Sequence, residues 1–99
     1  MNNITLVGRL GKDAETKQLK EKTVTNFTLA VSTNGETQWI NCRYWNAGKV
    51  TDFLRKGKLI GLTGELLIEH YEKGGATLVS PVVNVRRVEL LGKKDNDNE

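Results

Sequence analysis

Apolar and polar residues alternate along most of this chain of 99 residues, and this alternation restricts the possible folds more than any other feature. A repeat of two residues is typical of a β-strand that buries one face. The pattern marks residues 4–10, 26–31 and 38–45, and it returns in two longer stretches, 58–71 and 76–91. We therefore expect an all-β protein with five strands.

Turn-forming residues separate several of these stretches. Asn34-Gly35 lies between the second and third stretches, and this dipeptide is a strong signal for a two-residue hairpin turn. Residues 72–75 end in two glycines and predict the turn between the last two strands. Residues 12–22 are polar and charged, so they form either a long loop or a loosely paired segment. Pro81 is expected at a sheet edge or a bulge, because proline has no backbone N–H for pairing.

One segment between the third and fourth strands has the spacing of a helix. Val50, Phe53 and Leu54 would share one apolar stripe of that helix. Asn46 is a residue type that caps helix N-termini, and Gly57 suits the end of the helix. We therefore expect a short helix that places Phe53 in the core.

Five strands with one short helix between the third and the fourth form the OB-fold, a Greek-key barrel. A β-sandwich is the alternative architecture, but it normally needs more strands than this chain can supply. We expect the barrel to occupy residues 1–92. Residues 93–99 are polar and acidic, and we expect them to form a disordered tail.

The composition argues against several classes of function. The chain has no apolar run near the roughly 20 residues that span a bilayer and no signal-peptide pattern, so we expect a cytoplasmic protein. Cys42 is the only cysteine and His70 the only histidine, which excludes an intrachain disulfide and makes a metal site implausible. The sequence shows no nucleophile–base pair and no phosphate-binding glycine loop, so we expect no enzymatic activity, no cofactor and no metal.

The charge distribution points to an anionic partner. Lys and Arg number 15 against 12 Asp and Glu, a net charge of +3. Asp95, Asp97 and Glu99 all lie at the C-terminal end, so the rest of the chain is more basic than this total. A basic body is consistent with nucleic-acid binding, although on charge alone a solvated basic surface is the better explanation.

The third strand predicts where such a partner binds. Trp39 and Trp45 share one face of this strand, separated by roughly 20 Å, and Arg43 lies between them. Indoles spaced in this way can stack with bases while a nearby cation neutralises phosphate. The alternative is that both indoles lie in the core or in a subunit interface. The opposite face of the strand holds the side chains that we expect in the core: Ile40, Cys42 and Tyr44.

Two further aromatic residues bear on this site. Tyr71 lies near the tip of the predicted fourth strand, close to Lys73, and is a third candidate for base stacking. It could equally cover the mouth of the barrel. Phe27 fits the apolar pattern of the second strand, and we expect it in the core.

Four segments share an order and a spacing that identify a family. They are 3–13 (NITLVGRLGKD), 26–31 (NFTLAV), 38–45 (QWINCRYW), and 53–57 (FLRKG) leading into 64–66 (GEL). The chain resembles bacterial single-stranded DNA-binding protein over residues 2 to about 92. The resemblance implies an OB-fold, usually a homotetramer, around which single-stranded DNA wraps without sequence preference during replication, recombination or repair. Binding of DNA would place the protein at the nucleoid.

The resemblance also implies which residues bind DNA. Trp39, Trp45 and Tyr71 match the base-stacking aromatics of the family. Arg55 and Lys56 match its basic pair after the helix. We expect the DNA phosphates to contact basic side chains at five positions: Arg43, Lys49, Arg55, Lys56 and Lys73.

The chain departs from the family pattern in three respects. The loop 32–37 is shorter than the usual basic hairpin, and Leu67 and Glu69 stand where many relatives have basic residues. The acidic tip that recruits replication and repair enzymes is missing. We therefore expect a short form, either trimmed or naturally without this tip, with weaker binding per subunit or a smaller binding site. The alternative function is that of a primosome-type OB-fold protein, which is dimeric and acts mainly through protein contacts in replication restart.

Overall fold

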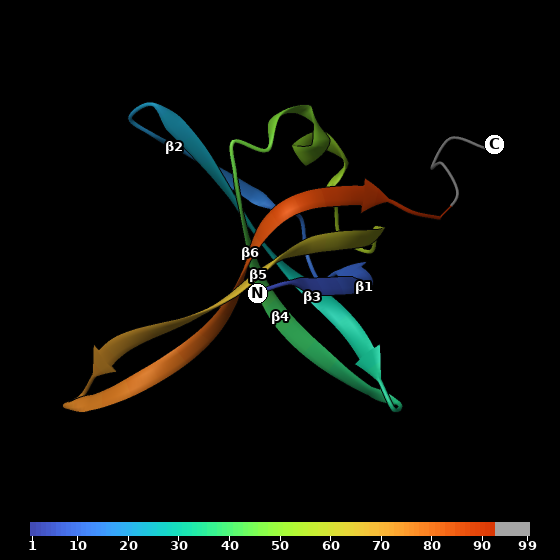
Figure 1. Cartoon of the computed structure of the whole chain (residues 1–99). Helices are drawn as coiled ribbons and strands as arrows, with labels where there is room; N and C mark the ends of the chain where they lie inside the picture. The colour runs from blue at the N-terminus through green and yellow to red at the C-terminus, as the bar shows by residue number, and fades with distance from the viewer. Residues whose placement is uncertain (93–99) are drawn as a thin grey trace.

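The computed structural model describes residues 1–92, which form one strongly curved sheet and one short helix (Figure 1). The elements are β1 (Ile4–Leu10), β2 (Glu15–Leu19), β3 (Lys22–Thr33), β4 (Glu36–Trp45), η1 (Gly48–Phe53), β5 (Leu59–Lys73) and β6 (Ala76–Leu90). The expected all-β class is confirmed, with the helix in the expected place between the third and fourth long strands.

The strand order places β1 between β5 and the far part of β3, so that the sheet curves back on itself. The order across the sheet is β1-β5-β6-β4-β3-β2, and the last two residues of β1 pair additionally with β3. Among the described strands, β4 and β6 are parallel and all other pairs are antiparallel. The last two residues of β1 and the whole of β2 pair with β3. β1 and β2 therefore act as one strand that is interrupted at 11–14. The five expected strands are therefore present, with the first one divided.

Residues 12–22 contain a paired segment, which settles the alternative left open by the sequence. β2 pairs along its whole length with the beginning of β3. The Oγ1 atoms of Thr16 and Thr25 lie 2.8 Å apart, and Thr25 is fully buried. The polar composition of β2 hid this strand, because all of its residues are exposed and no apolar face marks it.

Both predicted tight turns are present. Asn34 and Gly35 have φ angles of 52° and 81° and join β3 to β4. A two-residue type I′ turn requires positive φ at both positions, and asparagine and glycine tolerate it best. Gly74 and Gly75 also have positive φ and join β5 to β6.

The core lies within the curve of the sheet. Its buried members come from five strands and from the segment after η1: Leu10, Phe27, Leu29, Cys42, Leu54, Ile60, Leu62, Val83 and Val85. The core positions predicted for Phe27 and Cys42 are confirmed, and Tyr44 packs partly buried against the same cluster. Gly8 lets β1 come close to β3, because a Cβ at this position would lie 2.3 Å from the carbonyl oxygen of Ala30.

The helix differs from its prediction in type, cap and buried face. It is a 3₁₀ helix preceded by Ala47 without a side-chain cap, whereas Asn46 has φ 51° and accepts a hydrogen bond from the Thr23 N–H on its Oδ1. The prediction that Phe53 is buried is wrong, since it is 53% exposed. With three residues per turn, Phe53 lies on an exposed side of the helix, and Leu54 beyond the helix enters the core instead.

β5 and β6 form a long hairpin whose far half leaves the core (Figure 1). A register shift occurs at Thr63/Gly64, and a Cβ on Gly64 would lie 2.3 Å from the carbonyl oxygen of Asn84. Beyond this point Leu66 and Ile68, which the alternation places on the core face, are exposed. β6 pairs with β4 only from Val82 onward. Pro81 lies just before this point and pairs only with β5 among the described strands. Its expected edge position is confirmed.

We expect the thiol of Cys42 to be unreactive in the folded protein. Burial raises its pKa to about 12, and only 2% of the residue is exposed. Ellman's reagent should therefore react slowly in native buffer and rapidly in guanidinium chloride, because the thiolate is the reactive form. Rapid stoichiometric labelling of the native protein would contradict the buried position.

Candidate nucleic-acid interface

The outward face of β4 carries the two tryptophans predicted as a stacking surface. Trp39, Arg43 and Trp45 alternate with residues that face the core, including the buried Cys42. Trp39 is 64% exposed, which excludes the alternative that it belongs to the core of the subunit. Trp45 is only partly exposed.

The position of the Trp39 ring depends on the bend between β1 and β2. Its six-membered ring lies against Gly11, so closely that a Cβ at Gly11 would approach Cζ3 of the indole to 2.8 Å. Glycine at this position leaves room for the ring. The chain thus supports the indole on one side while most of its surface stays available to a ligand.

The ring of Trp45 is covered by a cation that the sequence analysis missed. Nζ of Lys22 lies 4.6 Å from the ring centroid, a cation–π contact. Lys22 begins β3, where Val24 pairs with Trp45. Only the register of β3 and β4 brings the two residues together, so no local sequence signal could have identified this contact. A base that stacks on Trp45 has a positive charge beside it.

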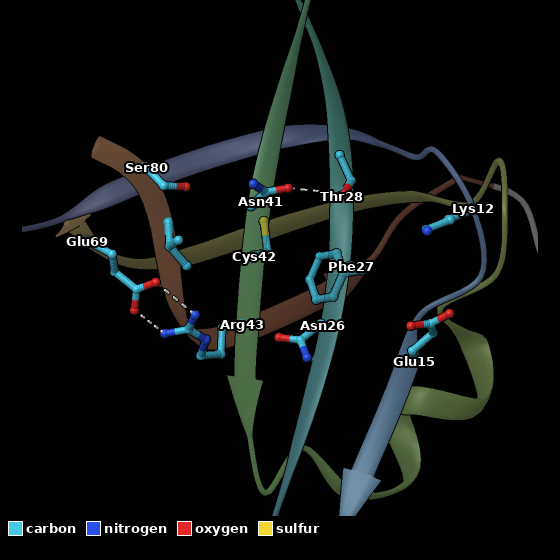
Figure 2. Close-up of a pocket in the computed structure, with 11 residues that line it drawn as sticks. Lys12, Glu15, Asn26, Phe27, Thr28, Asn41, Cys42, Arg43, Glu69 and Ser80 are labelled. Carbon is cyan, nitrogen blue, oxygen red and sulfur yellow. Dashed lines mark hydrogen bonds and ion pairs between the residues drawn. The ribbon is translucent and has the colours of Figure 1, made fainter. Parts of the chain in front are cut away.

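A shallow groove of about 400 Å³ runs across the middle of this surface (Figure 2). It is lined by Lys12 and Glu15 from the bend and β2, by Asn26, Phe27 and Thr28 from β3, by Asn41, Cys42 and Arg43 from β4, and by Glu69, Ser80 and Val82 from the β5–β6 hairpin. Lys12 and Arg43 are balanced by Glu15 and Glu69. The positive charge expected from the sequence is therefore not concentrated in this groove, and Lys12 is a groove residue that the sequence analysis did not single out.

Arg43 and Glu69 form a two-point ion pair in the groove (Figure 2). Nη1 of Arg43 donates to Oε2 of Glu69 at 2.6 Å, and Nη2 donates to Oε1 at 3.1 Å. The hydrogen bond from Arg43 lowers the pKa of Glu69, and the same bond raises the pKa of Arg43. The structure thus places Arg43 on the predicted face but gives its guanidinium a carboxylate partner.

Tyr71 and Lys73 lie farther out on the hairpin. Both lie at every second position after Glu69 along β5, so their side chains are on the same face of the strand as that of Glu69. Tyr71 is 48% exposed and pairs with Leu78 of β6 beyond the core. It does not line the groove, and its exposure argues against a role in covering the barrel mouth.

Two of the remaining predicted basic residues, Arg55 and Lys56, lie beside the bend between β1 and β2. Asp13 organises this region, because its Oδ1 accepts a hydrogen bond from the Lys56 N–H at 2.8 Å and its Oδ2 lies 3.5 Å from Nη1 of Arg55. Lys49 is exposed on η1. None of these three basic side chains is part of the groove lining, so the structure brings only Arg43 of the predicted phosphate ligands into the groove.

The described residues show no feature of a metal centre or a membrane span. Within residues 1–92, no three His, Cys, Asp or Glu side chains are grouped in a way that could hold a metal ion. In the same part of the chain no helix has both the length and the apolar character needed to cross a membrane.

We expect the carboxyl group of Glu69 to titrate below the ordinary pH range of glutamate. Because its pKa is lowered in the folded state, the pair stabilises the fold above the unfolded-state pKa, and this contribution is lost as the pH falls through the folded-state pKa. Carboxyl ¹³C NMR measures the titration directly. Arg43→Gln should return Glu69 toward its ordinary pKa, and an unchanged titration in this variant would show that the pair does not form in solution.

Comparison with known proteins identifies a family. The profile of the single-strand binding protein family matches residues 1–91. A relative named "Single-stranded DNA-binding protein 1" from Synechocystis sp. is 35% identical over the whole of this chain and 90% of its own length. A protein of the same name from Streptococcus pyogenes serotype M18 is 34% identical over 97% of this chain and 82% of its own length.

A second protein of that Streptococcus, "Single-stranded DNA-binding protein 2", is 40% identical over 84% of this chain and 58% of its own length. The matches confirm the resemblance found in the sequence and, with the strand order, the expected OB-fold. The chain belongs to the single-strand binding protein family.

Proposed function

We propose that this chain binds single-stranded DNA without sequence preference and protects it during replication, recombination or repair. Its membership of the single-strand binding protein family supports the ligand. The observation that carries the mechanism is the exposure of Trp39 on the outward face of β4, whose other face is in the core. An exposed indole on a rigid strand suits stacking with any base, since every base has a π-face.

Bases stack in this proposal on Trp39, Trp45 and Tyr71, with about 1–3 kcal/mol contributed by each. Phosphates contact Arg43, Lys49, Arg55, Lys56 and Lys73. Lys22 supports this mechanism further, because it already provides a cation at the ring of Trp45. Since stacking and phosphate contacts carry little sequence information, the protein distinguishes single strands from duplexes rather than one sequence from another.

In this proposal the chain is a binding protein and not an enzyme, and it uses neither a cofactor nor a metal. Its DNA ligand places it in the cytoplasm, at the nucleoid. We propose that its barrel comprises residues 1–92; the tail expected at 93–99 lies outside the described residues. Neither the described structure nor the relatives favour the primosome-type alternative, because the names of the relatives refer to DNA binding.

Poly(dT) should quench most of the tryptophan fluorescence, because Trp39 and Trp45 are the only two indoles in the chain. Trp39→Ala should weaken binding by about 1–3 kcal/mol, or roughly 5- to 150-fold. Trp39→Phe should restore part of the affinity. Phe53→Ala removes an exposed aromatic ring of η1 and should leave the affinity unchanged. Emission that does not change at saturating poly(dT) would contradict the stacking mechanism.

We propose further that the chain assembles into a homotetramer, with a dimer as the alternative. The support is the edge of β1: among the described strands, residues 4–8 of β1 pair only with β5, and β3 pairs only with the last two residues of β1. An unpaired edge of this kind is a template for another strand. Val7 on β1 is also more than half exposed, which leaves an apolar side chain at the same place.

Sedimentation equilibrium at micromolar concentration tests this assembly. We expect a mass near four times the 11.1 kDa of one chain. A mass of two chains together with weak poly(dT) binding would favour the primosome-type function. A mass of one chain would contradict assembly through β1.

A further inference from the structure

The centre of the proposed DNA surface contains a cation that already has an anionic partner. Arg43 lies between Trp39 and Trp45 on β4, and two of its N–H groups donate to the carboxylate of Glu69. A DNA phosphate offers the same recognition element as a carboxylate, namely two oxygen acceptors for a guanidinium fork. Glu69 and a phosphate therefore require the same donors of Arg43.

We propose that Glu69 competes with DNA phosphate for Arg43, so that the ion pair must open when a strand occupies the groove. Glu69 thereby lowers the affinity of the central part of the interface. This inference rests on the proposed DNA-binding function and assigns Glu69 a role opposite to that of the basic side chains around it.

Exposure makes the exchange feasible. The side chain of Arg43 is 28% exposed and that of Glu69 is 43% exposed, so a strand in the groove can reach both. Both residues line the groove, and Arg43 is held by β4, a strand that is paired on both sides. The guanidinium can turn from one acceptor to the other without a change in the backbone.

The charges of the groove make the competition costly for DNA. Among the described residues, its lining contains two basic residues, Lys12 and Arg43, and two acidic residues, Glu15 and Glu69. When phosphate takes the donors of Arg43, the Glu69 carboxylate loses its partner and faces a second anion nearby. The gain from the new contact is therefore offset by the loss of the old one and by repulsion.

Glu69→Gln tests the competition with a minimal change of shape. The amide can still accept a hydrogen bond from Arg43, but it carries no charge and competes poorly with phosphate. We expect binding of fluorescein-labelled oligo(dT), followed by anisotropy, to become about two- to tenfold tighter at moderate salt. The slope of log K against log salt should become more negative by up to about 0.7, the value for one further phosphate on a single strand.

A matched control separates this local effect from the general effect of net charge. Arg87 and Glu89 form an ion pair of 2.7 Å on β6, and neither residue lines the groove. Glu89→Gln makes the same change in net charge and also removes the negative charge from an Arg–Glu ion pair, one that has a single hydrogen bond and lies outside the groove. Glu69→Gln should tighten binding more than Glu89→Gln does. When each of these changes is made separately in an Arg43→Gln background, the difference between their effects should vanish.

Equal effects of the two glutamine variants would overturn the proposal, as would a Glu69→Gln effect that persists without Arg43. The wild type provides a test that does not depend on the folding of a variant. On saturation with oligo(dT), the ¹³C signal of the Glu69 carboxyl group should move toward its position in Arg43→Gln. A signal that stays in place while DNA is bound shows that the pair remains closed and overturns the competition. Failure of the wild type to bind oligo(dT) at low salt would instead refute the DNA-binding function itself.

Discussion

The position of β4 between β3 and β6 is the constraint on which the rest of the structure depends. Antiparallel pairing with β3 runs along the whole strand, and parallel pairing with β6 joins Asn41, Cys42 and Arg43 to the last strand. A strand held on both sides has little freedom to rotate or to shift its register. Burial of Cys42 on the inside therefore fixes which side chains of β4 face outward, and with them the tryptophans and Arg43.

The sequence was informative wherever local pattern and tertiary structure agree. Alternation predicted the long strands, Asn34-Gly35 predicted its hairpin, and the two faces of β4 were assigned correctly because one of them carries Ile40, Cys42 and Tyr44. It failed at Phe53, which is exposed on a 3₁₀ helix although the spacing predicted an apolar helical stripe. It also gave no sign of where the alternation of β5 changes face: Leu66, just beyond the register shift at Thr63/Gly64, is exposed.

The charged part of the site could be predicted only in part, for a related reason. The basic residues were found by their type and their place in the family pattern, yet a charge acts through its partners. Glu69 lies 26 positions after Arg43 in the chain, and Lys22 contacts Trp45 only because of the register of two strands. Counting charges along the sequence gives a basic protein, whereas the part of residues 1–92 that lines the groove has equal numbers of basic and acidic side chains. Attraction for a polyanion must then come from the surface around the groove more than from its floor.

The contact of Trp39 with Gly11 links two regions that are far apart in the chain. Gly11 is two residues from Asp13, which holds the backbone of Lys56 through its carboxylate. The indole on β4 and the basic segment after η1 are thus attached to the same short piece of backbone. In the proposed mode of DNA binding, Trp39 and the basic pair Arg55–Lys56 share this one support. A change of the backbone at 11–13 would then alter two of the proposed contact regions of the strand together.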